Sequence, residues 1–142
     1  MIEPKFRYLS LSKEKRSEIL EKLRRSLEDL GSIVFAYVHG GFIEREFFRD
    51  LDLALWVEDL SNSLKYAVDL SVKLRIKLGI PVDVQVLNEA PLPFKYHVFT
   101  EGTLVISRDE DLRSRVVDVT IREYLDFKKL KEVSRKTSSL AR

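Results

Sequence analysis

Cysteine is absent from this chain, and methionine and tryptophan each occur once. The lack of cysteine excludes a disulfide framework, thiolate metal ligands and a thiol nucleophile. No apolar run approaches the length of a membrane span, and the N-terminal residues lack the apolar stretch of a signal peptide, so we expect a cytoplasmic protein. The formal net charge of +2 is close to balance and gives no indication of nucleic-acid binding.

Charged residues, in contrast, are abundant. They make up 34% of the 142 residues, beside 44% hydrophobic residues, which is typical of a globular domain with a substantial core. Many charges combined with few thermolabile residues are also typical of thermophilic proteins. We place the domain at residues 1–127. The segment 128–142 is basic, rich in Ser and Thr and without apolar periodicity, so it is predicted to be a flexible tail.

Apolar periodicity predicts an α/β domain. The predicted helices cover residues 12–30, 62–78 and 108–130, and the predicted strands cover 33–38, 51–57, 82–87 and 102–107. Residues 62–78 also alternate with period two, but a helix is favoured because a strand of that length would be unusual. Residues 88–96 contain two prolines and are predicted to form a loop. The order of elements predicts one domain with a mixed β-sheet and flanking α-helices, mainly on one face.

Two carboxylates open one of the predicted strands. Asp50 and Asp52 are two residues apart at the start of strand 51–57, so their side chains point the same way, roughly 6.5–7 Å apart along the strand. Asp83 lies on the polar face of strand 82–87. If the two strands are neighbours, the three carboxylates share one edge, where they can bind one or two divalent cations such as Mg²⁺.

Two adjacent glycines, Gly40 and Gly41, follow the first predicted strand. Glycines permit a tight turn, and the backbone N–H groups of such a turn can bind a phosphate. Purely structural roles stay open: a plain turn for the glycines, a surface ion pair for Asp50, and a solvated strand face for Asp83. His39 and the other histidine are isolated, without metal-ligand spacing, and are expected to be structural.

The stretch "HGGFIEREFFRDLDLALWV" (39–57), with the later "VDVQV", resembles the minimal nucleotidyltransferases, small members of the DNA polymerase β-like nucleotidyltransferase superfamily. The resemblance extends loosely over residues 12–127. The family motif is Gly-Ser, a loop, Asp-x-Asp, and a third Asp from a later strand. The resemblance implies phosphate binding by Gly40 and Gly41, and catalysis and metal binding by Asp50, Asp52 and Asp83. This chain departs from the motif in having Gly41 in place of the serine and a shorter loop, residues 42–49.

The resemblance also implies an activity and a partner. Family members use Mg²⁺, here two ions, to transfer a nucleoside monophosphate, here AMP from ATP, to an acceptor. Many are antitoxins encoded beside a HEPN-domain toxin, which they adenylylate. The small size leaves little room for an acceptor-binding domain, so a partner protein or a second copy would complete the acceptor site. The alternative is a catalytically weak or inactive antitoxin that neutralises its partner by binding: the missing serine favours it, and the intact carboxylates favour the enzyme.

Overall fold

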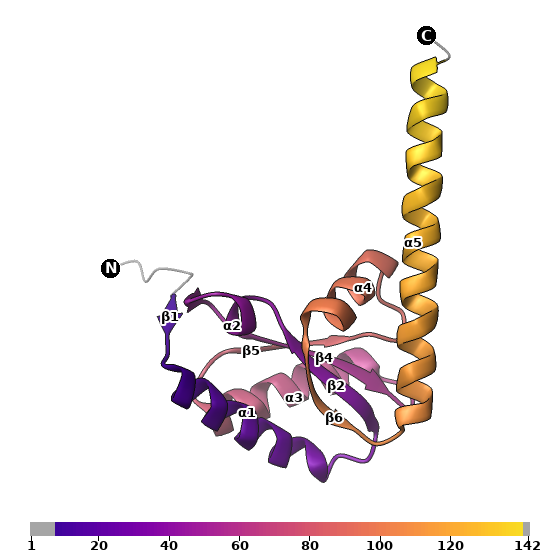
Figure 1. The fold of residues 1–142 in the computed structure, drawn as a ribbon. Helices are drawn as coiled ribbons and strands as arrows, with labels where there is room; N and C mark the ends of the chain where they lie inside the picture. The colour runs from indigo at the N-terminus through magenta and orange to yellow at the C-terminus, as the bar shows by residue number, and fades with distance from the viewer. Residues whose placement is uncertain (1–7, 141–142) are drawn as a thin grey trace.

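A four-stranded mixed sheet forms the centre of the fold in the computed structural model, which describes residues 8–140, with side chains up to residue 137 (Figure 1). Its strands, in spatial order, are β5 (Val82–Val86), β4 (Leu51–Val57), β2 (Ile33–His39) and β6 (Thr103–Ser107). The central pair β2 and β4 is antiparallel, as is β2 with β6, whereas β4 and β5 run parallel. The predicted mixed sheet is therefore confirmed, and β4 and β5 are neighbours.

Two helices, α1 (Lys13–Glu28) and α3 (Ser63–Leu78), cover one face of the sheet. Ser12 caps α1 by accepting a hydrogen bond from the backbone N–H of Lys15, and Gly79, with φ +74°, ends α3. Both helices bury residues at helical spacing: Ile19, Leu23 and Leu27 on α1, and Ala67, Leu70, Leu74 and Leu78 on α3. The helix predicted for residues 62–78 is therefore confirmed.

The other face of the sheet is covered by α4 (Leu92–Glu101) and the N-terminal part of α5 (Glu110–Leu140). The expectation of helices mainly on one face is therefore wrong. Every residue of β2 except one is buried, so large apolar side chains such as Phe35 and Val38 need cover on both faces. The loop predicted for residues 88–96 is also wrong in its second half, because Pro91 and Pro93 begin α4 and proline is tolerated in the first turn of a helix.

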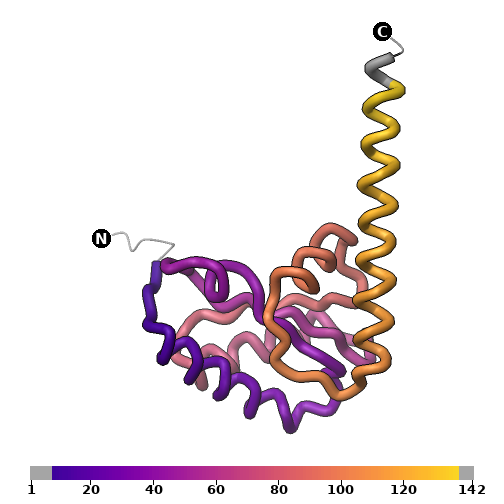
Figure 2. The backbone as a smooth tube through the Cα atoms, in the orientation of Figure 1, coloured from indigo at the N-terminus to yellow at the C-terminus, as the bar shows by residue number. Residues whose placement is uncertain are grey.

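Helix α5 extends well beyond the rest of the molecule (Figures 1 and 2). The segment from residue 128, predicted to be a flexible tail, continues α5 as regular helix to Leu140. Its exposed side chains explain why apolar periodicity gave no signal there. The boundary between a domain of residues 1–127 and a separate tail stays a prediction. None of the helices in residues 8–140 combines the length and apolarity needed to cross a bilayer.

A small second sheet and a short helix complete the structure near the glycines. Strands β1 (Leu9–Ser10) and β3 (Phe47–Phe48) pair antiparallel, and α2 (Gly41–Glu44) follows β2 directly. Elements of two to four residues are too short to give a periodic sequence signal. They matter because they place the chain between Gly41 and Asp50 over the end of the central sheet.

Candidate active site

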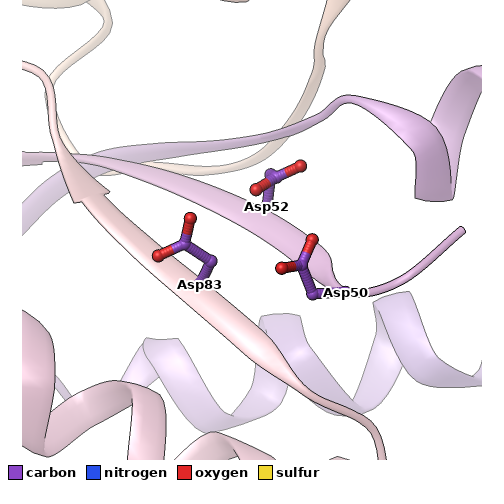
Figure 3. A group of neighbouring side chains, drawn as sticks. All are labelled: Asp50, Asp52 and Asp83. Carbon is purple, nitrogen blue, oxygen red and sulfur yellow. The ribbon is translucent and has the colours of Figure 1, made fainter. Parts of the chain in front are cut away.

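Three carboxylates converge at the edge where β4 and β5 begin (Figure 3). Asp52 and Asp83 are direct neighbours in the parallel register of the two strands, and Asp50 immediately precedes β4. One carboxylate oxygen from each residue lies within 4.8 Å of the others. The structure thus brings together the three acids that the sequence singled out. The condition on which the shared edge depended, that the two strands be neighbours, is met.

Burial and mutual repulsion make this cluster costly when all three groups are ionised. Partial burial raises the pKa of Asp52, and the nearby Asp50 carboxylate raises it further. The pKa of Asp50 is raised by burial first and by the charge of Asp83 second. Three converging oxygen donors with excess negative charge are the donor set that a hard divalent cation such as Mg²⁺ prefers. The residues present therefore fit such an ion.

Gln85 bridges two of the carboxylates. Its side-chain Nε2 donates hydrogen bonds to Asp52 Oδ1 at 3.1 Å and to Asp83 Oδ2 at 2.7 Å. Ionised carboxylates only accept, so the amide nitrogen must face them and the amide oxygen must point away. That oxygen lies 2.8 Å from Nε2 of His39, which therefore carries the proton and donates. Gln85 fixes the two acids, and His39 fixes Gln85.

His39 is buried, with 6% of its surface exposed, and lies opposite Asp52 in the β2–β4 register. Its ring packs against that of Phe94 of α4 in a T-shaped arrangement, with ring centroids 5.3 Å apart. The structural role expected for this histidine stays a prediction, and its hydrogen bond to Gln85 connects it to the carboxylates. Sequence reasoning missed Gln85. The signal that it shares a strand face with Asp83 was present, but its partners became visible only in the fold.

The glycine turn lies directly against the carboxylates. Gly40 has φ +77° and ψ −155°, a conformation open to glycine alone. A Cβ at this position would lie 2.5 Å from Oδ2 of Asp52. A Cβ on Gly41 would lie 3.2 Å from Cβ of the buried Phe48, which is tighter than an ordinary contact. The turn therefore requires glycine for both backbone conformation and space.

Arg16 of α1 holds the segment that connects this turn to the acids. Its guanidinium lies over the rings of Phe48 and Phe42, 4.9 and 5.6 Å from their centroids. It donates hydrogen bonds to the backbone carbonyls of Leu11, Phe42, Arg45 and Glu46, at 2.6 to 3.0 Å. Three of the four acceptors, the carbonyls of Phe42, Arg45 and Glu46, lie 26 to 30 residues from Arg16 along the chain, so the sequence carried no signal for these contacts.

Replacing Arg16 by lysine is expected to lower the free energy of unfolding by about 1–3 kcal/mol. An ammonium group cannot reproduce the planar fork that serves four carbonyls, so some of them lose their donor. Chemical denaturation measures the difference. The matched control is Arg24→Lys on the same helix, whose ion pairs with Glu21 and Glu28 are exposed and contribute little. Equal small losses in both variants would contradict the role of Arg16.

Comparison with known families gives one match that bears on the whole site. The polymerase beta nucleotidyltransferase family matches residues 21–111, which include both glycines and all three carboxylates. Comparison with curated proteins finds no relative of significant sequence similarity.

Solved structures share the fold. A chain in a toxin–antitoxin structure with AMP-PNP superposes with a TM-score of 0.68 and 20% identity, covering 83% of this chain and 96% of its own. A chain in the MntA–HepT toxin–antitoxin structure gives 0.61 and 18%, covering 89% and 97%. A chain from a tri-AMPylated Shewanella oneidensis HEPN toxin in complex with MNT antitoxin gives 0.62 and 18%, covering 89% and 98%. Because the family match spans more than half of the sequence, the chain belongs to the polymerase beta nucleotidyltransferase family.

Proposed function

We propose that this protein transfers a nucleoside monophosphate, AMP from ATP, to a hydroxyl group of a partner protein and releases pyrophosphate. The observation that carries this proposal is the convergence of Asp50, Asp52 and Asp83 beside the turn at Gly40 and Gly41. Membership of the nucleotidyltransferase family supports the reaction class. The similar structures with AMP-PNP and with a tri-AMPylated toxin support adenylate as the transferred group.

Each element of the site has a part in this reaction. Asp50, Asp52 and Asp83 would hold Mg²⁺, two ions in the full complex. Mg²⁺ bound there would neutralise the triphosphate charge and polarise the phosphoryl oxygens. The backbone of Gly40 and Gly41 would contact the triphosphate, because no side chain blocks its approach. Gln85 keeps the carboxylates of Asp52 and Asp83 aimed at the same point.

The transfer is an in-line substitution at the α-phosphorus. The acceptor oxygen forms a new bond to this phosphorus while the bond to the bridging oxygen of the β-phosphate breaks. Pyrophosphate leaves with that oxygen and its electron pair. The proton of the acceptor hydroxyl passes to Asp83, the most exposed of the three carboxylates and therefore the one open to an incoming acceptor.

The acceptor is proposed to be a HEPN-type toxin, a small helical protein. The described residues form one nucleotidyltransferase core and an extended helix, without a separate acceptor domain. The similar solved structures are toxin–antitoxin complexes. A second candidate function is neutralisation by binding alone. The tight space beside Gly41 favours it, because this chain cannot add the serine of the family motif there without moving Phe48.

Label transfer tests the proposal. The protein is incubated with α-labelled ATP, Mg²⁺ and the HEPN-type product of the adjacent gene, and label on each chain is measured after separation. We expect label on the partner, and none with an Asp50→Asn, Asp52→Asn double variant. An unlabelled partner that still forms a stable complex would select neutralisation by binding.

A further inference from the structure

The outer side of α3 carries a continuous ridge of exposed aliphatic side chains. The ridge consists of Leu64, Val68, Val72 and Ile76, with exposed fractions of 78%, 55%, 55% and 78%. A spacing of four residues places these side chains in one row along the helix. The opposite side of α3 packs on the sheet. The helix is therefore apolar on two sides, which is not expected of a helix that faces solvent.

The neighbouring helix α1 shows what a solvent-facing surface looks like in this protein. Its outer side carries Arg24 paired with Glu21 and Glu28, so these three charges are neutralised within the helix. Helix α3 exposes four cations and one anion: Lys65, Lys73, Arg75, Lys77 and Asp69. None of these five has an ion pair among the residues that the structure describes. The ridge is thus bordered by an excess of positive charge, with four cations beside one anion.

This positive charge favours a helix with acidic flanks over a second copy of the chain as the occupant of the ridge. Packing two copies of the chain ridge to ridge would bring the cations of both α3 helices together, at a cost in repulsion. An apolar helix bordered by Asp and Glu would cover the ridge and neutralise its border. We propose that the α3 ridge is the docking surface for an amphipathic helix with acidic flanks, presented by the partner protein. This inference rests on the proposed function, since that partner is the acceptor named above.

The position of the ridge suits an acceptor. Helix α3 ends at Leu78, and residues 79–81 lead directly into β5, which carries Asp83. The backbone N–H of Leu51 donates to the carbonyl of Pro81 at 2.9 Å, which ties this turn to the start of β4. The Ile76 end of the ridge therefore lies at the same end of the sheet as the carboxylates. A helix seated on the ridge reaches toward the active site without covering it.

A matched pair of variants tests the surface. In Val68→Glu, Val72→Glu the ridge is interrupted by acidic residues, and glutamate is a better helix former than valine, so α3 is retained. The control is Leu130→Glu, Val133→Glu, which changes two aliphatic residues of similar exposure, 69% and 56%, on the extended part of α5. Circular dichroism checks that both variants keep the helical content of the wild type.

Binding is measured by titration calorimetry with the HEPN-type product of the adjacent gene, without ATP. We expect at least a hundredfold weaker binding for the α3 variant, unchanged binding for the α5 control, and weaker wild-type binding as salt rises. Unchanged affinity of the α3 variant, or no binding by the wild type, would overturn the proposal. A concentration-dependent wild-type dimer that the α3 variant abolishes would assign the ridge to a second copy instead.

The same samples separate this proposal from the proposed function. Binding without nucleotide does not depend on catalysis, and the Asp50→Asn, Asp52→Asn variant should bind the partner as the wild type does. Ridge-dependent binding without label transfer would support the docking surface and contradict the proposed transferase activity. Undiminished label transfer to the partner by the α3 variant would support the transferase activity and contradict the docking surface.

Discussion

Replacing Asp52 by asparagine is expected to reduce nucleotidyl transfer by about a thousandfold while leaving the fold intact. The carboxylate of Asp52 contributes both to the proposed cation site, with Asp50 and Asp83, and to a hydrogen bond from the amide of Gln85. Asparagine keeps a similar size and a hydrogen-bond acceptor for Gln85 but removes a charge from the proposed cation site. Loss of one such charge costs several kcal/mol of transition-state stabilisation. Asp50→Asn is expected to act in the same direction.

The same substitutions, which lower the activity, should not lower the stability of the metal-free protein. The folded-state pKa of Asp50 and of Asp52 is raised, so between the unfolded and folded values the native state binds more protons than the unfolded chain. The stabilisation that these groups provide when protonated is complete below their unfolded pKa and is lost as the pH rises through the folded pKa. Asparagine does not ionise, so each variant should lose less stability over this window and be at least as stable as the wild type at neutral pH.

Melting temperatures with and without Mg²⁺ and ATP measure both effects. The wild type should gain stability from the ligands, and the variants should gain little. In a pH series measured in chelator, the melting temperature of the wild type should fall more steeply with rising pH than that of either variant. A wild type that gains nothing from Mg²⁺ and ATP, together with variants that are less stable in chelator, would mean that the acids are structural.

The carboxylate site was accessible from the sequence because strand geometry is strictly periodic. Two acids at positions 50 and 52 must point the same way on an extended chain, and a third acid on a neighbouring strand joins them once the pairing is known. Gln85 follows the same rule but was not recognised, because an amide on a polar face is ordinary until its acceptors are located. Arg16 lay beyond sequence reasoning, since its carbonyl acceptors are as many as 30 residues away.

The errors in the fold also have physical causes. Proline usually marks a loop, but in the first turn of α4 its missing N–H group has no partner to lose, so Pro91 and Pro93 start a helix. The helices on the second face follow from β2, whose neighbours Phe35 and Ala36 point to opposite faces and are both fully buried. The extent of α5 could not be read from periodicity, because the side chains of residues 125–137 are all exposed and need no apolar stripe.

Replacing Gly40 by alanine is expected to reduce the rate of nucleotidyl transfer by more than the accompanying loss of stability can explain. The added Cβ would lie 2.5 Å from Oδ2 of Asp52, so this carboxylate must move away from the position where it meets Asp50 and Asp83. Misplacing a reacting group by about 1 Å can cost about a hundredfold in rate. We therefore expect a loss of transfer of at least that size, with weaker stabilisation by Mg²⁺ and ATP.

Gly79 provides the matched control, because it also has positive φ, +74°, but no atom lies within 4 Å of the position of its missing Cβ. Gly79→Ala should cost about 1–2 kcal/mol of stability through backbone strain and leave the transfer rate of the folded protein unchanged. The two variants are compared by chemical denaturation and by label transfer at a temperature where both are folded. If Gly40→Ala loses stability but transfers AMP at the wild-type rate, the glycine serves the turn alone. A loss of transfer in Gly40→Ala but not in Gly79→Ala would show that glycine is needed at position 40 because a side chain there displaces the carboxylate of Asp52.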